Sequence, residues 1–219
     1  MLGCEDARGD GVSTRAPSLW SRVFVPHAVS VLRPVLGVCV LAGVAPRTES
    51  ILLLPVVLLA CFTDWVDGEL ARRSALQTRR GRLVDNLCDF GFLLCIFAFL
   101  ARCEVWTPPV WGRLARHWQG ANWLPVYALV ASFAVYFVRL CREMAAGGEP
   151  ARSPRGHTAG ISNYLLAVAG AVEMLPGVNF GPWLLEPAMV GVALLNLAAV
   201  PENLQLMFHH RGGAPRMPA

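Results

Sequence analysis

The sequence predicts an all-α membrane protein, a polytopic bundle of six transmembrane helices, and three observations support this fold class. Hydrophobic residues make up 55% of the 219 residues and charged residues only 16%, whereas about a quarter of a typical soluble domain is charged. The apolar residues gather in six stretches, several of which approach the roughly 20 residues that a helix needs to cross a bilayer. Arginines lie between these stretches with a strong bias to one side. The stretches cover residues 23–44, 51–70, 83–100, 124–140, 161–175 and 183–200.

The order of these stretches sets the predicted domain organisation. The first is longer than the apolar region of a signal peptide and is followed by five more, which predicts an uncleaved helix. The fifth is short and reaches a full span only if its helix extends back towards His157. Residues 102–122, which include Pro108 and Pro109, are predicted to form an outer loop. We therefore expect a cytoplasmic N-terminal tail with a surface helix at 1–22, a six-helix domain at 23–208 and a cytoplasmic C-terminal tail at 209–219.

The arginines predict the orientation in the membrane. All 19 lysine-plus-arginine positions are arginine. If the N-terminus is cytoplasmic, fourteen arginines fall on the cytoplasmic side and four on the opposite side, and Arg33 lies inside the first stretch. An excess of positive charge in cytoplasmic loops is typical of membrane proteins. We expect a multi-pass protein of the cell membrane with both termini in the cytoplasm.

The seven cysteines do not indicate a disulfide framework or a zinc site. Their number is odd, no C-x-x-C pair occurs, and most of them fall inside apolar stretches. This pattern predicts small, reduced side chains within the helix bundle.

Four aspartates are the strongest functional signal in the sequence. The chain has six aspartates, of which Asp64, Asp67, Asp85 and Asp89 lie within 26 residues at the ends of predicted membrane helices. A carboxylate in the membrane is costly unless it is paired or binds a metal ion. Helix capping explains single acidic residues but does not require two pairs at helical spacing.

The spacing places these aspartates on two helix faces. Positions 64, 67, 68, 71 and 72 share one face of a helix, and positions 81, 85 and 89 share one face of the next. The connection between the two helices is short, which predicts antiparallel packing with the two faces opposed. All four carboxylates are then expected at one height near the cytoplasmic surface, where their mutual repulsion requires cations.

The donor atoms suggest which cations these are. Hard carboxylate oxygens suit Mg²⁺ or Mn²⁺, and four acids can hold two such ions. Two ions can bind a diphosphate and stabilise a leaving phosphate. A carboxylate can also accept the proton of an attacking hydroxyl, and Arg72, one turn further along, can bind a phosphate. These residues predict phosphoryl-transfer chemistry.

The same residues resemble a known family. The pattern D-x2-D-G-x2-A-R-x8-G-x3-D-x3-D, from Asp64 to Asp89, fits the signature of the CDP-alcohol phosphatidyltransferases of the integral-membrane class-I type at every fixed position. The six helices, and the place of the motif across the second and third, resemble the family as well. The resemblance implies a divalent-metal-dependent enzyme that uses CDP-diacylglycerol, releases CMP and forms homodimers, with its active site at the cytoplasmic face.

The resemblance also implies roles for individual residues. Asp64, Asp67 and Asp85 are similar to the family's metal ligands, and Asp89 is similar to the residue that both contacts metal and acts as the catalytic base. The positions that would bind the nucleotide are Gly68, Ala71, Arg72 and Gly81.

The acceptor alcohol stays open between glycerol 3-phosphate and inositol types. Asn86 and Phe90 stand where several members that make phosphatidylglycerol phosphate have proline and lysine, and the opening of the first helix, with Ser30 and Arg33, matches the family only in part. Four further arginines are candidates for binding an acceptor phosphate, although the charge bias of the topology also explains them. These are Arg139, Arg142, Arg152 and Arg155.

Two alternatives to this function are left open. One is a CDP-amino-alcohol phosphotransferase, in which diacylglycerol is the acceptor. The other is a non-enzymatic ion or metal transporter, since acids inside a membrane also line ion paths. A transporter should show polar residues at several depths, whereas the middles of these apolar stretches are almost uncharged. The expected partners are a CDP-lipid, an alcohol and membrane lipids, and not nucleic acid.

Overall fold

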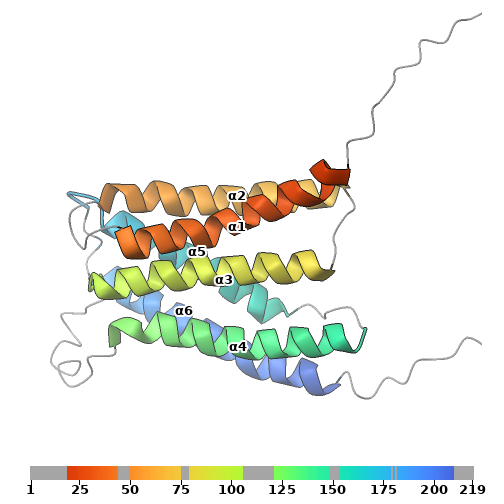
Figure 1. The fold of residues 1–219 in the computed structure, drawn as a ribbon. Helices are drawn as coiled ribbons and strands as arrows, with labels where there is room; N and C mark the ends of the chain where they lie inside the picture. The colour runs from red at the N-terminus through yellow and green to blue at the C-terminus, as the bar shows by residue number, and fades with distance from the viewer. Residues whose placement is uncertain are drawn as a thin grey trace, which may run out of the picture.

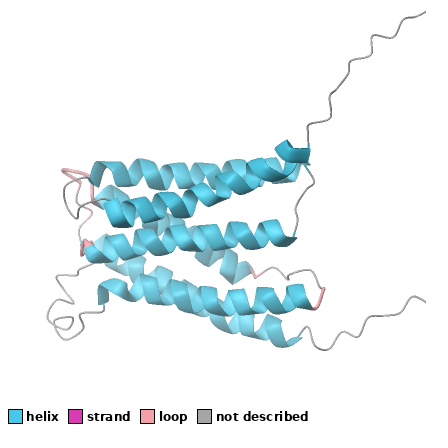
Figure 2. Cartoon of the chain, viewed as in Figure 1, coloured by secondary structure: helices cyan, strands magenta, loops and turns pink. Residues whose placement is uncertain are grey.

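The described part of the chain is helical apart from short turns. In this computed structural model the described residues are 19–43, 50–74, 79–105, 121–147, 153–178, 180 and 182–209, and side chains are described for 30–43, 51–66, 68–69, 81–105, 122–147, 153–178, 180 and 183–208. No strand occurs among them (Figure 2), and the all-α prediction is confirmed. The elements are α1 (Leu19–Gly43), η1 (Ser50–Leu52), α2 (Leu53–Ser74), α3 (Arg79–Arg102), η4 (Ala121–Trp123), α4 (Leu124–Ala145), α5 (Pro154–Glu173) and α6 (Pro182–His209).

Several helices begin or end beyond their apolar stretches. Helix α5 does extend back past His157, because Ser153 caps its first turn: the Ser153 hydroxyl oxygen accepts a hydrogen bond of 3.0 Å from the Gly156 backbone N–H. Pro154 follows at the first helical position, where its missing N–H costs nothing. Helix α1 begins inside the segment that was predicted to be a tail.

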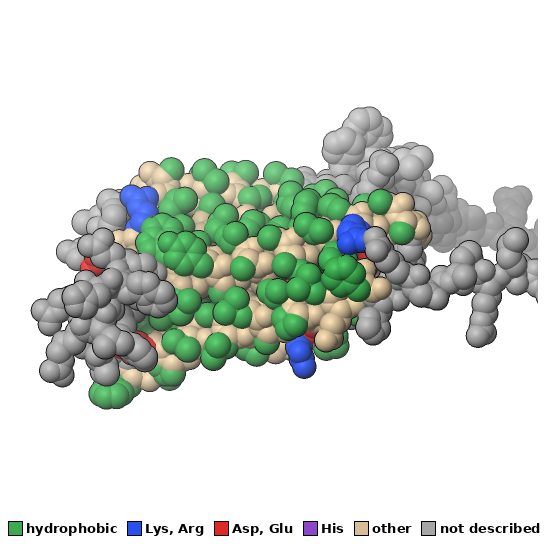
Figure 3. Space-filling model, turned by 90° about the horizontal axis from the view of Figure 1, so that it is seen from below, with side chains coloured by type: hydrophobic (Ala, Val, Ile, Leu, Met, Phe, Trp, Pro, Cys, Tyr) green, Lys and Arg blue, Asp and Glu red, His purple; other side chains and the backbone are tan. Residues whose placement is uncertain are grey.

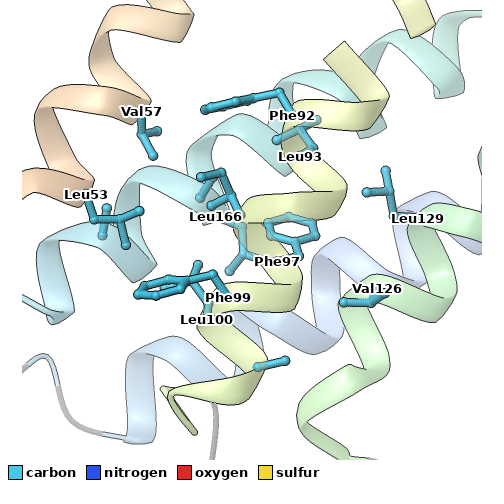
Figure 4. Packing of buried hydrophobic residues seen from close by; sticks show 14 of the residues in the cluster. Leu53, Val57, Phe92, Leu93, Phe97, Phe99, Leu100, Val126, Leu129 and Leu166 are labelled. Atoms are coloured by element: carbon cyan, nitrogen blue, oxygen red, sulfur yellow. The ribbon is translucent and has the colours of Figure 1, made fainter. Parts of the chain in front are cut away.

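The six helices form one bundle in which α3 is central (Figure 1). Helix α3 packs against α1, α4 and α5, while α6 closes the bundle against α4 and α5. The buried side chains of Phe92 and Phe97 on α3 belong to one apolar cluster with Val57 of α2, Leu129 of α4 and Leu166 of α5 (Figure 4). Helix α1 begins and α6 ends at the same end of the bundle (Figure 1).

The two aspartate-bearing helices do not pack face to face as predicted. Helix α2 packs against α1 and α5, and neither α2 nor α3 has the other among its main partners in the described residues. Both helices pack against α1 instead, and the contacts between α1 and α3 are the most extensive in the bundle. The prediction of directly opposed faces was therefore wrong, because a short connection fixes only the order of two helices and not their neighbours.

The surface is that of a membrane protein. Large apolar side chains such as Leu165, Trp183 and Leu194 are more than half exposed, and Figure 3 shows apolar side chains spread over the viewed face with few charged ones among them. Three described helical segments are long and apolar enough to cross a membrane, namely Gly81–Arg102, Leu124–Ala145 and Trp183–Phe208. The segments Ser30–Gly43 and Leu53–Val66 are apolar but shorter. Six helices are thus present among the described residues, whereas six membrane spans are not confirmed.

Candidate active site

Small residues bring α1 close to α3. A Cβ atom added to Gly37 would meet the Cβ of Cys95 at 3.0 Å and the Cα of Phe92 at 3.3 Å, and one added to Gly91 would meet Pro34 at 3.5 Å. Such distances mean that the two backbones lie nearly as near as helices can pack. The close approach holds the preceding turns of α1 and α3 against each other, and those turns carry the polar residues of the site.

Ser30 and Asp85 form the first of these polar contacts. The Ser30 hydroxyl, which is fully buried, donates a hydrogen bond of 2.7 Å to Oδ1 of the half-buried Asp85. Because hydroxyl groups are short, this bond fixes the position of the Asp85 carboxylate closely relative to α1.

Arg33 forms the second contact, one turn further along α1. Its side chain is only 1% exposed, and its Nη1 atom lies 3.0 Å from Oδ1 of Asp64 on α2. The same nitrogen contacts Oδ1 of Asp89 on α3. A guanidinium buried at this depth is tolerated only when carboxylates neutralise it. Arg33 therefore joins the two halves of the aspartate motif through α1.

Tyr164 adds a fourth helix to the cluster. Its hydroxyl donates a hydrogen bond of 2.9 Å to Oδ1 of Asp89. The neighbouring Asn163 is buried and exchanges two amide hydrogen bonds, of 3.2 and 2.8 Å, with Asn196 of α6. This amide pair fixes α5 against α6, and so sets the height at which Tyr164 meets Asp89.

The charges of the cluster suit a divalent cation. The Arg33 guanidinium contacts the carboxylates of Asp64 and Asp89, while that of Asp85 bonds to Ser30. The single charge of Arg33 therefore balances one of the three negative charges. Asp64 is the most open of the three, with 51% of its side chain exposed, against 24% for Asp89. Hard oxygen donors with an excess of negative charge fit Mg²⁺ or Mn²⁺. Among the side chains that the structure describes, however, no three acidic, histidine or cysteine residues converge closely enough to form a complete metal site.

Comparison with known families agrees with this arrangement. A sequence model described as CDP-alcohol phosphatidyltransferase matches residues 23–200. The chain belongs to this family. Membership supports a transferase of phospholipid biosynthesis that acts at membranes and transfers a phosphatidyl group with a CDP-alcohol as donor. No curated protein shows significant sequence similarity to the chain.

The other predicted residues of this CDP-alcohol phosphatidyltransferase lie on the same two helices. Gly68 is half-buried on α2, and Gly81 is buried at the beginning of α3. The backbones of Asp67, Ala71 and Arg72 continue α2, but their side chains lie outside the described residues. Their predicted roles in metal and nucleotide binding stay predictions.

The arginines predicted to bind an acceptor phosphate do not share one environment. Arg139 is buried, with Nε 3.5 Å from Oε1 of Glu143 and its guanidinium 5.5 Å from the centre of the Tyr136 ring. Arg142 and Arg155 are exposed, and Arg152 lies outside the described residues. Two of the three described arginines thus face solvent or headgroups, while Arg139 points into the bundle.

The two positions that depart from the phosphatidylglycerol phosphate pattern make packing contacts with α4. The Asn86 amide donates a hydrogen bond of 2.8 Å to the Tyr136 hydroxyl. The Phe90 ring stacks on Phe133 with centroids 3.9 Å apart. Both side chains point towards α4 and away from Asp85 and Asp89. The α3–α4 interface therefore accounts for asparagine and phenylalanine at these two positions.

Sequence reasoning did not assign Arg33 or Tyr164 a role at the aspartates. Arg33 was considered only as part of the opening of the first helix. A signal was present for Arg33, since a charge inside an apolar helix requires a partner. No comparable signal marks Tyr164, which lies in the middle of α5, because a single tyrosine in an apolar helix does not reveal which group its hydroxyl will bond.

Proposed function

We propose that this protein transfers a phosphatidyl group from CDP-diacylglycerol to the hydroxyl of a small alcohol or phospho-alcohol of glycerol 3-phosphate or inositol type, and releases CMP. One observation carries the proposal: Asp64 of α2 and Asp89 of α3, from the two halves of the family motif, contact the same buried guanidinium. Family membership over residues 23–200 supports the same class of reaction.

The proposed step is a displacement at phosphorus. The acceptor hydroxyl oxygen forms a bond to the phosphorus that carries the lipid, the bond from that phosphorus to the CMP oxygen breaks, and the hydroxyl proton passes to Asp89. Bound Mg²⁺ or Mn²⁺, held by Asp64, Asp67, Asp85 and Asp89, would supply positive charge for the diphosphate and for the leaving phosphate. Gly68, Ala71, Arg72 and Gly81 are proposed to hold the cytidine diphosphate.

The contacts of Asp89 support its proposed role as base. Its Oδ1 atom accepts from Tyr164 and contacts Arg33, which leaves Oδ2 as the oxygen for an incoming proton. A general base must reach the proton that it removes, and a fixed carboxylate reaches it in a defined direction. We further propose, from the family resemblance, that the enzyme is a homodimer whose site and termini face the cytoplasm.

The test is an assay of CMP release. Purified protein is incubated with CDP-diacylglycerol, Mg²⁺ or Mn²⁺ and a panel of alcohols that includes glycerol 3-phosphate and inositol. We expect CMP to appear with one of them and to stop in excess chelator. Undiminished release in chelator would count against the cations. If CMP is released only from a CDP-amino-alcohol in the presence of diacylglycerol, the lipid is the acceptor and the alcohol belongs to the donor.

A further inference from the structure

We infer that Arg33 is the resident counter-ion of the aspartate cluster, and that it competes with the divalent cation for Asp64 and Asp89. This inference rests on the proposed function, because it concerns the cation that the function requires. It adds a residue that sets the affinity of the site for that cation.

The position of Arg33 provides the first argument. Its Nη1 atom lies between Asp64 of α2 and Asp89 of α3 and contacts both carboxylates, which are two of the four proposed metal ligands. A positive group in contact with both carboxylates neutralises charge that a bound cation would otherwise neutralise, so the two would compete for the same ligands.

Electrostatics provides the second argument. Two positive groups in contact with the same carboxylates repel each other, and the repulsion is strong where water is excluded. The Arg33 side chain is 1% exposed, so solvent screens it poorly. An arginine cannot reduce this repulsion by losing its proton, because its charge is permanent. When a cation binds, the guanidinium must therefore move away from the carboxylates, or the cation must bind against the repulsion of the guanidinium charge.

Burial provides the third argument. Without a neutralising charge, the partly buried carboxylates of Asp85 and Asp89 and the more open one of Asp64 would repel one another beside an apolar core. Arg33 offsets this repulsion and keeps α2 and α3 in place through α1. The cost of that stabilisation is a weaker site for the cation. The affinity for Mg²⁺ or Mn²⁺ is thus lower than four carboxylates alone would give.

The test measures Mn²⁺ binding to the full-length protein in detergent by electron paramagnetic resonance of free Mn²⁺. The variants are Arg33→Lys, which keeps the charge but loses the planar fork, and Arg33→Gln, which removes the charge. The matched control is Arg139→Gln, since Arg139 is also buried and paired but contacts Glu143 on α4. We expect Mn²⁺ to bind about threefold more tightly to Arg33→Lys and at least about tenfold more tightly to Arg33→Gln, with the control unchanged.

A second readout is the rise in unfolding temperature that Mn²⁺ produces, which should be larger in Arg33→Gln than in the wild type. If Arg33→Gln does not accumulate, Arg33→Lys alone decides. Equal or weaker binding in the Arg33 variants, with binding intact in the wild type, overturns this inference and leaves the proposed function standing. Absence of Mn²⁺ binding in every form overturns the inference together with the cation requirement of the proposed function.

Discussion

The two sides of α3 show how one helix can separate chemistry from packing. On the side towards α1 and α5, Asp85 and Asp89 bond to Ser30, Arg33 and Tyr164. On the side towards α4, the Asn86 amide donates to the Tyr136 hydroxyl and the Phe90 ring stacks on Phe133. Residues that are neighbours in sequence thus serve different interfaces, because successive positions on a helix point about 100° apart.

This difference predicts that substitutions on the two sides have different consequences. Changes on the α1 and α5 side should alter turnover with little effect on insertion. Changes on the α4 side should alter stability with little effect on turnover. Four experiments test the division.

The largest effect is expected from Asp89→Asn. The amide keeps the size of the side chain but cannot accept the proton, so CMP release should fall by about 100- to 10,000-fold, the usual contribution of a general base. The measurement is CMP release at saturating CDP-diacylglycerol, with membrane insertion checked by fractionation. Near-normal turnover in an inserted variant would refute the role of Asp89, and Asp85→Asn offers a parallel test of a proposed metal ligand.

A smaller effect is expected from Gly37→Ala, which acts on the α1–α3 contact. The new Cβ would meet Cys95 at 3.0 Å and Phe92 at 3.3 Å, so α1 must move outward by a few tenths of an ångström. Arg33 and Ser30 would move with it, and turnover should fall roughly tenfold because reacting groups lose their alignment. The control is Gly43→Ala at the end of the same helix, where a Cβ meets nothing within 4 Å. Equal activity of the two variants would show that this close approach does not position the site.

Phe90→Leu tests the α4 side. The substitution removes the stack on Phe133 and should lower stability by about 0.5–1.5 kcal/mol, the usual value of an aromatic pair beyond its buried area. Thermal unfolding in detergent measures the loss, and CMP release should stay within about threefold of wild type because Phe90 is not in contact with the carboxylates. A large loss of turnover at unchanged stability would place Phe90 in the site after all.

The smallest effect is expected from the bond between Asn86 and Tyr136. Asn86→Ala and Tyr136→Phe should each cost about 1 kcal/mol of stability, the typical net value of one hydrogen bond. The double variant should cost less than the sum, since both changes remove the same interaction. Strict additivity of the three unfolding free energies would mean that the 2.8 Å contact contributes nothing.

The helices, and the helix faces that carry the aspartates, could be predicted from the sequence because both depend on local spacing. Apolar stretches of membrane length predict helices directly, and Ser153 with Pro154 marks the beginning of α5 in the sequence itself. The partners of those aspartates were not predicted. Arg33 reaches Asp64 across 31 residues and Asp89 across 56, and local spacing carries no information about which helices become neighbours.

The wrong prediction, that α2 and α3 pack directly against each other, also rested on local information. A short connection between α2 and α3 suggested direct packing, yet Gly37 and Gly91 let α1 take the place beside α3. Small residues in an apolar helix indicate that another helix can come close, but they do not identify which one.

The buried arginine of α1 also constrains how the protein is made. While the ribosome is still extending the chain, α1 exists before Asp64, 31 residues later, and Asp89, 56 residues later. Until those residues are made, the Arg33 guanidinium, which is buried in the folded bundle, has no carboxylate of α2 or α3 to neutralise it, and burying an unpaired charge is costly. Helix α1 should therefore take its final place beside α3 only after both later helices have been synthesised.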